Sequence, residues 1–445
     1  MSYEYINETF KRLAGNNINI FEHIFLPTII YSYNENQEHS FEDFLKNLNM
    51  HDLERIYPTG MHIYNLLIQQ SNIDKELIQK FTHSDLVLLG DIQANNLTKY
   101  SDGNFVYHKS DNTGANLLQK ILDELSLDSC IIPNDELLND DYHKREFLQV
   151  KNDTSDINDV ISYFYNLGRT VPILLALTTY DLIYSNIIVN NARPVFFDLD
   201  CIFYPRVKKE FGEYTYSITS GRLFRTNYSK QLSGVRGGLN PIPKALEPVI
   251  QFDDNTPYLV WGVLQQSKQE NLIKLNNIAQ DIQNYIEVFL QGYDESVNDI
   301  KKNKTKILDI ILKYNGSSRY VLRSTHRYKS ILSAYHMPPI YQTRKLDEYL
   351  KEQLTKKHVM HIPNLNLDTL INDELKKLEQ GIIPYYKGYI NTTDIVNEFG
   401  EKVAELSTTP FENLINHFNS FDDDYFDVQK EMLKKSLNDS FIQYN

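Results

Sequence analysis

The sequence predicts an α+β protein with a helical N-terminal segment, a small antiparallel sheet and a large helical C-terminal part. Apolar residues recur at helical spacing through residues 1–80. In residues 83–110 the pattern changes to short runs of β-branched and aromatic residues, and the Asp102-Gly103 pair between two of them marks a hairpin turn. Helical spacing dominates again in residues 270–435. Together these patterns favour helices and a small sheet that are segregated along the chain.

The elements can be placed by residue number. Strands are expected at 86–91, 96–100 and 104–109. Helices are expected after them at 117–127, 157–177, 278–289, 307–314, 346–356, 367–378 and 426–437. Gly168 and Pro172 are expected to interrupt the helix at 157–177. The expected divisions are a helical segment at 1–82, a sheet-containing part at 83–150, a central part at 151–240 and a helical part at 241–445.

The composition is that of a folded enzyme rather than a disordered chain. Hydrophobic residues make up 41% of the 445 residues and aromatic residues 12%, which is enough for a sizeable core. The formal net charge of -14 argues against non-specific binding to nucleic acid and against docking on anionic lipid. A basic peptide or a metal-bound nucleotide remains compatible with that charge.

Cysteine content and hydropathy indicate the compartment. Cys130 and Cys201 are the only cysteines, so no disulfide framework or cysteine-rich zinc site can form, and both are expected to be buried free thiols in a reducing cytoplasm. The N-terminus has no basic-then-apolar signal pattern. No apolar run approaches the roughly 20 residues that a transmembrane helix needs, so a cytoplasmic protein is expected.

The most informative stretch is residues 186–197. Two short apolar runs flank the turn cluster at 190–193, which is a β-hairpin pattern. Three polar residues stand at its margins: Asp181, Asn186 and Asp198.

This spacing is typical of phosphoryl-transfer sites. Protein kinases carry an H-R-D-L-x-x-x-N loop and then a D-F-G aspartate beyond a short hairpin. In such a site Asp181 would orient a hydroxyl and accept its proton, while Asn186 and Asp198 would hold Mg²⁺ on ATP. A hairpin brings its two ends together, so these two residues can share one metal. The alternative is an ordinary hairpin with surface polar residues at its ends.

A lysine for the phosphates is expected on the upstream sheet. The third strand ends in His108 and Lys109, and Lys109 is either the phosphate lysine or a solvated strand-end residue, with His108 an equally good polar candidate. No G-x-G-x-x-G motif precedes it, which disfavours a standard protein-kinase lobe. Glu124 and Glu146 both remain open as the carboxylate partner of this lysine.

Arginines gather in two downstream segments. Residues 214–238 stand where a kinase keeps its activation segment, and they contain Arg222 and Arg225. Further on, three arginines spaced by four residues would share one helical face, as a solvated or salt-bridged face or as an anion site; they are Arg319, Arg323 and Arg327.

In this order the segments resemble the N-terminal dehydration domain of LanM-type (class II) lanthipeptide synthetases. TYDLIYSN at 179–186 and PVFFDLDCIF at 194–203 are similar to the family's T-D-L-H-x-E-N and P-V-x-x-D-L-E-T-L-F. The remaining motifs G-D-S-H, V-Y-K-P-R, R-x-x-x-R-x-T-x-x-Y and G-D-I-P-Y-F resemble GDIQ at 90–93, VYHK at 106–109, RYVLRSTHRY at 319–328 and GIIPYY at 381–386. The resemblance covers roughly residues 80–435.

The resemblance implies a lipid-kinase-like bilobal core, ATP and Mg²⁺ as cofactors, and a precursor peptide with a leader segment as substrate. Such a domain phosphorylates Ser and Thr of the peptide and eliminates the phosphate to leave dehydroalanine or dehydrobutyrine. Asp91 and Gln93 would belong to the nucleotide lobe with His108 and Lys109. Elimination needs a cation for the departing phosphate, for which the candidates are Arg222 and Arg225. Residues 1–82 are a candidate for docking the leader.

The departures from the family pattern define the alternatives. Ile183 and Gln93 replace two family histidines, and His108 aligns with the family's nucleotide lysine. A degenerate member that acts only as a peptide kinase, or as a non-catalytic peptide-binding partner, is the rival interpretation, and a small-molecule or lipid kinase is a third. The chain stops near where the family's zinc cyclase domain would begin, so no zinc is expected and a separate cyclase, other modifying enzyme or exporter would act afterwards.

Overall fold

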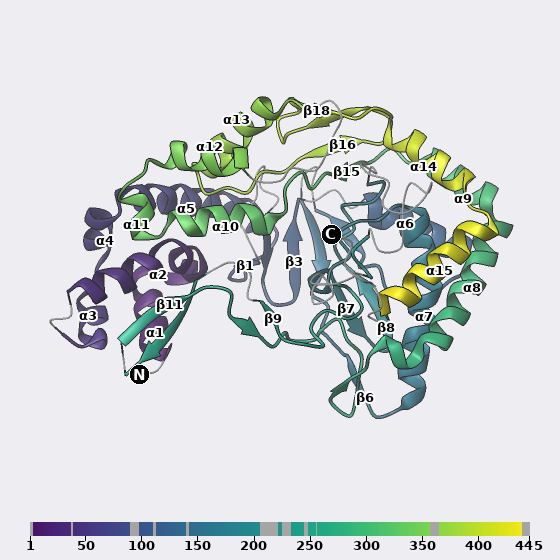
Figure 1. Cartoon of the computed structure of the whole chain (residues 1–445), viewed down its shortest axis with the longest axis horizontal. Coiled ribbons are helices and arrows are strands. Elements are labelled where there is room, and N and C mark those ends of the chain that lie inside the picture. Colours follow the sequence, from purple (N-terminus) through teal and green to yellow (C-terminus); the bar gives the residue numbers. More distant parts are fainter. Residues whose placement is uncertain are drawn as a thin grey trace.

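The computed structural model describes residues 3–36, 39–89, 98–109, 113–138, 142–204, 221–224, 233–243, 248–254, 256–356 and 365–437. It is a mixed α+β structure, as the sequence predicts, and it contains several small sheets rather than the one that was expected. In Figure 1 the N-terminal helices lie at one end, the five-stranded sheet lies in the middle, and long helices close the other end. The predicted boundaries between parts of the chain stay predictions. The N-terminal helices share one hydrophobic core with residues 328–383.

The N-terminal segment is helical, which confirms the prediction for residues 1–80. Its elements are α1 (Tyr3–Ala14), the 3₁₀ turn η1 (Gly15–Asn17), α2 (Ile18–Glu35), α3 (Phe41–Asn47), α4 (Met50–Ile56) and α5 (Pro58–Ile78). Ser40 and Asn49 cap α3 and α4 by accepting the backbone N–H groups of Asp43 and Asp52. The buried face of these helices packs against residues 328–383, so the segment is joined to the C-terminal part of the chain.

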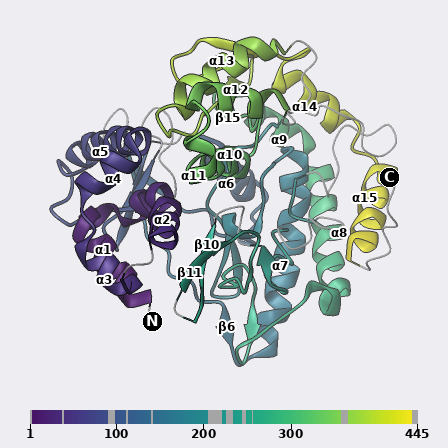
Figure 2. The same cartoon turned by 60° about the vertical axis from the view of Figure 1, so that its left-hand side comes forward.

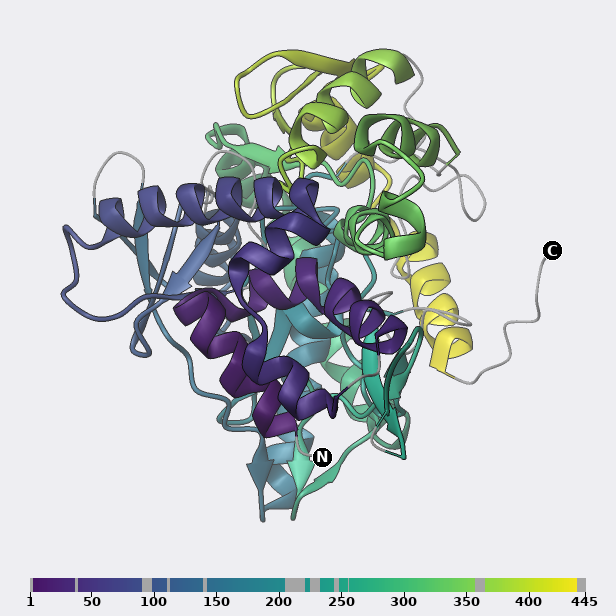
Figure 3. The ribbon, with the colours of Figure 1, turned by 90° about the vertical axis from the view of Figure 1, so that its left-hand side faces the viewer.

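The predicted small sheet has five antiparallel strands. They lie in the order β1 (Val87–Leu89), β2 (Lys99–Ser101), β3 (Phe105–His108), β5 (His143–Glu146) and β4 (Asp135–Leu137). The Asp102-Gly103 turn between β2 and β3 is confirmed, since the Asp102 carboxylate accepts the N–H groups of Asn104 and Phe105. Figure 3 shows α5 running beside this sheet, where Ile78 joins a cluster with Tyr100 and Tyr107.

Helix α6 (Thr113–Glu124) replaces the predicted helix at 117–127 and lies directly on the loop after Asp198. A Cβ atom at Gly114 would lie 2.6 Å from the carbonyl oxygen of Leu199, so only glycine allows this approach. The helix therefore begins earlier than expected because its first turn packs against the centre of the molecule.

The predicted interruption of the central helix is wrong. Helix α7 (Ile157–Ala176) continues through Gly168 and Pro172 and packs along α8 (Ile286–Lys302). Gly168 serves this packing, because a Cβ atom there would lie 2.1 Å from the carbonyl oxygen of Phe289. The predicted helix at 278–289 is also corrected, since that stretch holds β14 (Ile278–Ala279) and the 3₁₀ turn η5 (Ile282–Tyr285) before α8 begins.

The C-terminal part is largely helical, as predicted, but only α12 and α13 have the predicted bounds, and a sheet that was not predicted lies among the helices. The helices are α9 (Lys304–Leu312), α10 (Thr325–Tyr335), α11 (Pro338–Tyr341), α12 (Leu346–Lys356), α13 (Leu367–Leu378), α14 (Pro410–Asn419) and α15 (Asp423–Leu437). A four-stranded antiparallel sheet joins β15 (Ser317–Arg319), β16 (Lys387–Tyr389), β17 (Asp394–Val396) and β18 (Lys402–Glu405). Its strands are short and polar, and β15 pairs with a strand about 70 residues away, so local patterns carry no signal for it.

The remaining strands are short connections. They are β6 (Asp153–Thr154), β9 (Ile242–Pro243), β10 (Val249–Asp253), β11 (Thr256–Val260), β12 (Leu264–Gln265) and β13 (Lys274–Leu275). The pairs β10–β11, β9–β12 and β13–β14 are antiparallel, whereas β6 pairs with β13 in parallel. Figure 2 shows α15 beside α8, where Lys430 bonds Asp294 at 2.7 Å.

Two further expectations can be compared with the structure. Cys130 and Cys201 are buried free thiols, as predicted. None of the helices in the described ranges combines the length and the apolar character needed to cross a bilayer.

The predicted helical face of three arginines is wrong. Arg319 ends strand β15, Arg323 lies in the turn that follows, and Arg327 is in α10. Arg323 is fully buried and its Nε donates to Glu374 Oε1 at 2.7 Å, so it belongs to an internal ion pair rather than to an anion site.

Removal of the Arg323 side chain is expected to destabilise the protein strongly. Arg323→Met leaves the Glu374 carboxylate buried without its cation, which should lower the free energy of unfolding by about 3–5 kcal/mol. Urea unfolding followed by circular dichroism measures this loss. Arg327→Met at a half-buried position should change stability by less than about 0.5 kcal/mol, and the double variant Arg323→Met/Glu374→Leu should regain part of the loss. Equal stability of the first two variants would contradict the prediction.

Candidate functional site

The predicted hairpin is present and is closed by a tight turn. Strands β7 (Ile187–Asn190) and β8 (Arg193–Phe196) pair antiparallel, with Asn190 opposite Arg193. Asn191 and Ala192 both have positive φ angles, +48° and +59°, which is the conformation of a type I′ turn. The pairing brings the two ends together, since the N–H of Phe197 lies 3.5 Å from the carbonyl oxygen of Asn186. Asn186 and Asp198 are therefore neighbours, as the spacing predicts.

Asp181 is held in a strained backbone conformation at the start of this site. Its φ angle is +63°, which costs a non-glycine residue of the order of 1 kcal/mol or more. The surroundings maintain it: the carbonyl oxygen of Asp181 accepts the Asn186 Nδ2–H at 2.8 Å, and the N–H of Leu182 donates to Gly221 at 3.0 Å. The amide group of Asn186 is thereby oriented, and its Oδ1 accepts a long bond of 3.4 Å from the Ser185 hydroxyl.

Arg222 is the partner of the Asp181 side chain. Its Nη1 donates to Asp181 Oδ1 at 2.6 Å, and its guanidinium lies 4.4 Å from the centre of the Tyr180 ring. Tyr180 stacks on Tyr204 at 4.1 Å, so the cation rests on an aromatic pair. About a fifth of each partner of the ion pair is exposed, with 21% for Asp181 and 19% for Arg222.

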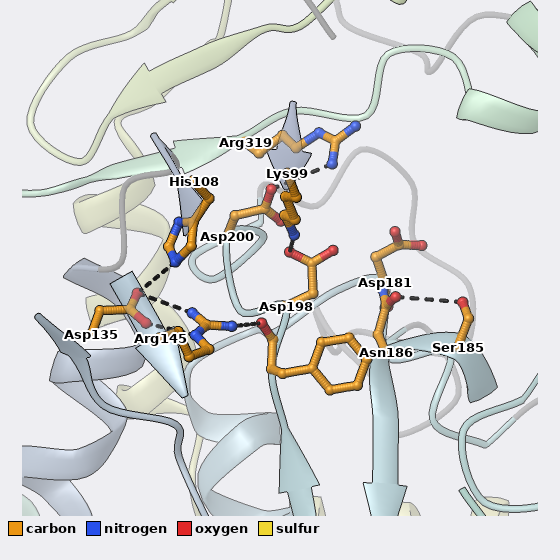
Figure 4. A network of polar contacts seen from close by, with 11 residues as sticks. Lys99, His108, Asp135, Arg145, Asp181, Ser185, Asn186, Asp198, Asp200 and Arg319 are labelled. Carbon is orange, nitrogen blue, oxygen red and sulfur yellow. Dashed lines mark hydrogen bonds and ion pairs between the residues drawn. The ribbon is translucent and has the colours of Figure 1, made fainter. Parts of the chain in front are cut away.

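A lysine that the sequence did not single out lies beside Asp198. Lys99 Nζ, on β2, is 3.5 Å from Asp198 Oδ1 (Figure 4). Burial opposes ionisation of Asp198, but the charges of Lys99, Arg319 and Arg145 outweigh it and lower the pKa of the carboxyl group. Asp198 is therefore an anion at neutral pH, which a metal-binding carboxylate must be.

A second carboxylate shares this loop. Asp200 is held by Arg319, whose Nη1 lies 3.3 Å from Asp200 Oδ2 and whose backbone N–H donates to the Asp200 carbonyl oxygen at 2.8 Å. Burial and the nearby Asp198 charge raise the pKa of Asp200. The pair thus gives one firmly ionised carboxylate and one that is harder to ionise.

The geometry favours Lys99 over the two predicted cofactor-binding residues at the end of β3, His108 and Lys109. The Lys109 ammonium lies 4.8 Å from the centre of the Tyr142 ring. His108 is buried, and its Nε2 lies 3.2 Å from Asp135 Oδ2. Burial lowers the pKa of His108 despite that carboxylate.

Neither predicted carboxylate partner of the lysine reaches this region. Glu124 bonds Lys306 of α9 at 2.7 Å, and Glu146 is exposed at the end of β5. The buried carboxylate of the sheet is Asp135, which accepts two hydrogen bonds from Arg145. Three other predicted site residues lie outside the described residues: Asp91, Gln93 and Arg225.

The described parts of the predicted activation segment pack on the Asp181 loop. Ile183, which stands where the resemblance expects a histidine, forms a backbone bridge with Ser233. The Asn271 amide donates to the carbonyl oxygens of Gly234 and Gly237 at 2.8 and 3.0 Å and fixes this segment. The backbone of the Asp181 loop is therefore bonded to the segment that carries Arg222.

The signal for Lys99 was available in the hairpin register. Tyr100 pairs with Tyr107, and the same register continued by one residue sets Lys99 opposite His108 on one face of the sheet. Arg319 and Arg145 had no comparable local signal, because they meet the Asp198 loop from two different sheets.

The site can hold phosphate and a hard divalent cation. Carboxylate and amide oxygens from Asp198 and Asn186 are suitable ligands for Mg²⁺, and the cations Lys99 and Arg319 are suitable for phosphate oxygens. Within the described ranges no group of three or more His, Cys, Asp or Glu side chains is arranged around a metal position.

Comparison with known proteins identifies the class. Residues 108–388, more than half of the chain, match the family model described as Domain of unknown function (DUF4135). The chain belongs to this family, which is found in LanM-type lanthipeptide synthetases.

A curated relative supports the same placement. The chain is 22% identical over 318 residues to the lacticin 481/lactococcin biosynthesis protein LcnDR2 of Lactococcus lactis subsp. lactis. The alignment covers 64% of this chain and 32% of the relative, so it spans about a third of that protein's length. Both matches confirm the resemblance to the LanM dehydratase region that the sequence motifs indicated.

Proposed function

We propose that this protein is a LanM-like dehydratase that uses ATP and Mg²⁺ to phosphorylate Ser and Thr of a precursor peptide and then eliminates the phosphate. The observation that carries the proposal is the arrangement at one end of the β7–β8 hairpin. There Asn186 bonds the backbone of Asp181 and lies opposite Phe197, the residue before Asp198, and Lys99 is 3.5 Å from Asp198. The family membership supports a precursor peptide as the substrate. We also propose that the five-stranded sheet and the α7–α8 part correspond to the two lobes of a lipid-kinase-like core.

In the first step Asp181 orients the peptide hydroxyl and accepts its proton. The hydroxyl oxygen bonds to the γ-phosphorus as the bond to the ADP oxygen breaks. Asp198 and Asn186 would hold Mg²⁺, which when bound neutralises phosphate charge. Lys99 and Arg319 add positive charge on the same side of the site.

In the second step a base removes the Cα proton, and the Cβ–O bond breaks as phosphate leaves with its electron pair. The net change in the peptide is the loss of water. Arg222 is our candidate for the cation that stabilises the departing phosphate, because its guanidinium lies at the Asp181 side of the site. A precursor peptide would dock its leader on the N-terminal helices.

The direct test is incubation of the protein with a precursor peptide, ATP and Mg²⁺, followed by mass spectrometry of the peptide. Phosphorylation adds about 80 Da per site and dehydration removes about 18 Da. Dehydrated peptide that disappears with EDTA supports the proposal. An unchanged peptide would overturn it, and ATP hydrolysis without any peptide would indicate a small-molecule or lipid kinase.

A second candidate function is a peptide kinase that stops at phosphorylation. Ile183, rather than the family's histidine, bridges to Ser233 beside Asp181, so one polar group expected near the reacting atoms is missing. Phosphorylated peptide as the final product would support this candidate over the dehydratase.

Substitution of Arg222 is expected to separate the two steps. Arg222→Gln should slow elimination about 10–100-fold, because a cation at the departing phosphate is removed, and phosphorylated peptide should accumulate. Time courses by mass spectrometry measure the ratio of phosphorylated to dehydrated product. Arg193→Gln, whose partner is the surface residue Asp128, is the control and should leave that ratio unchanged. An unchanged ratio in Arg222→Gln would exclude this role.

A further inference from the structure

One arginine fixes the loop after the β7–β8 hairpin to the five-stranded sheet. Arg145 in β5 stands directly opposite Asp135 in β4. Its Nε and Nη2 donate to the two carboxylate oxygens of Asp135 at 2.6 and 3.0 Å, and its Nη1 donates to the Phe197 carbonyl oxygen at 2.7 Å (Figure 4). Because the guanidinium is planar, the forked bond to Asp135 sets the direction in which the third bond points.

The anchor of this arginine is buried and charged. The side chains of His108, Asp135 and Arg145 are 1%, 4% and 11% exposed. Burial alone would raise the pKa of Asp135, but the contact with His108 at 3.2 Å and the Arg145 guanidinium lower it to about 2. The carboxylate is ionised, so it holds the arginine with two strong bonds in a site that excludes water.

The bond to Phe197 acts on the residue that follows it. The Phe197 carbonyl shares its peptide plane with the N–H of Asp198, so a shift of that oxygen turns the backbone from which the Asp198 side chain projects. Stabilising the sheet would require only the pair Asp135–Arg145. The additional bond across to the hairpin end points to a role in the site.

We propose that His108, Asp135 and Arg145 form a positioning group that holds the Phe197 carbonyl and thereby aims Asp198 at the divalent cation. The proposal rests on the proposed function. It also gives position 108, which the resemblance aligns with a nucleotide lysine, a role in the anchor while Lys99 faces Asp198 from the neighbouring strand. These are positioning residues, since they act through Asp198.

The test compares Arg145→Met with Arg169→Met. Arg169 is a matched control: it is 15% exposed and bonds Glu295 and Asp299 at 2.7 and 2.8 Å, between α7 and α8 and away from the hairpin end. Binding of Mn²⁺ in the presence of a non-hydrolysable ATP analogue is measured by electron paramagnetic resonance. Loss of a residue that orients a metal ligand should weaken Mn²⁺ binding about 10–100-fold in Arg145→Met. Arg169→Met should bind Mn²⁺ as tightly as the wild type does, although Arg145→Met and Arg169→Met both lose stability.

Turnover provides the second measurement. Arg145→Met should lower kcat for phosphorylation by a similar factor and leave KM for the peptide unchanged, because the peptide does not contact this group. Arg145→Lys can keep one hydrogen bond but not all three, so its kcat should lie between the values of the wild type and Arg145→Met. If Arg145→Met fails to fold, Asp135→Asn, which keeps an acceptor for Arg145, is measured in the same way.

Wild-type Mn²⁺ affinity and kcat in a folded Arg145→Met or Asp135→Asn would overturn the positioning role and leave the proposed function standing. A wild-type protein that binds neither Mn²⁺ nor nucleotide would refute the proposed function and the positioning role together. The wild-type measurement therefore distinguishes failure of the proposed function from failure of the positioning role alone.

Discussion

Asp198→Asn is expected to lower the rate of peptide phosphorylation by about 1,000-fold, because the proposed metal ligand loses its charge. The lowered pKa of Asp198 shows that Lys99, Arg319 and Arg145 create a potential that favours a carboxylate there. An amide in the same place satisfies the shape of the loop but leaves these cations uncompensated. Metal and nucleotide binding should both weaken, which a titration with Mn²⁺ and an ATP analogue measures alongside turnover.

The matched control for this prediction is Asp299→Asn. Asp299 is 31% exposed and bonds Arg169, and Asp198 is 22% exposed and pairs with Lys99, so both variants remove a half-buried, ion-paired charge. Asp299 belongs to α8 and its ion pair joins α8 to α7, away from the hairpin end, so its variant should keep full turnover. Wild-type activity of Asp198→Asn would exclude the proposed metal site.

Lys99→Met is expected to lower kcat/KM for ATP by about 100-fold. Methionine preserves the length of the side chain and its packing on β2 but removes the charge next to Asp198. The KM for the peptide should change little, since Lys99 faces the proposed phosphates. Steady-state kinetics with varied ATP and fixed peptide measures the effect.

Two other lysines sharpen this prediction. Lys144→Met on β5 is the control, because Lys144 is 26% exposed and lies over the Phe105 ring, whereas Lys99 is 31% exposed. Lys109→Met should lower kcat/KM for ATP less than Lys99→Met does, since the Lys109 ammonium lies over the Tyr142 ring. A larger loss from Lys109→Met would restore the lysine assignment made from the sequence.

The elements with strong local patterns were predictable from the sequence. Helices α12 and α13 have the expected bounds, and the β7–β8 hairpin follows from apolar runs around a tight turn. Errors arose where tertiary packing outweighs local propensity. Gly168 and Pro172 lie inside a continuous helix because α7 packs closely on α8. The spacing of its arginines predicts a helix where β15 forms, because the partner strand β16 is distant in sequence.

The sequence by itself determined the family and the order of the three polar residues Asp181, Asn186 and Asp198, because a hairpin of about ten residues joins its ends without help from the rest of the chain. Only the tertiary structure decided which cations meet that hairpin. Lys99, Arg145 and Arg319 come from β2, β5 and β15, and their charges converge on one loop because two sheets far apart in sequence pack around it. Periodicity reports which face of an element is buried, but it does not report which other element covers that face.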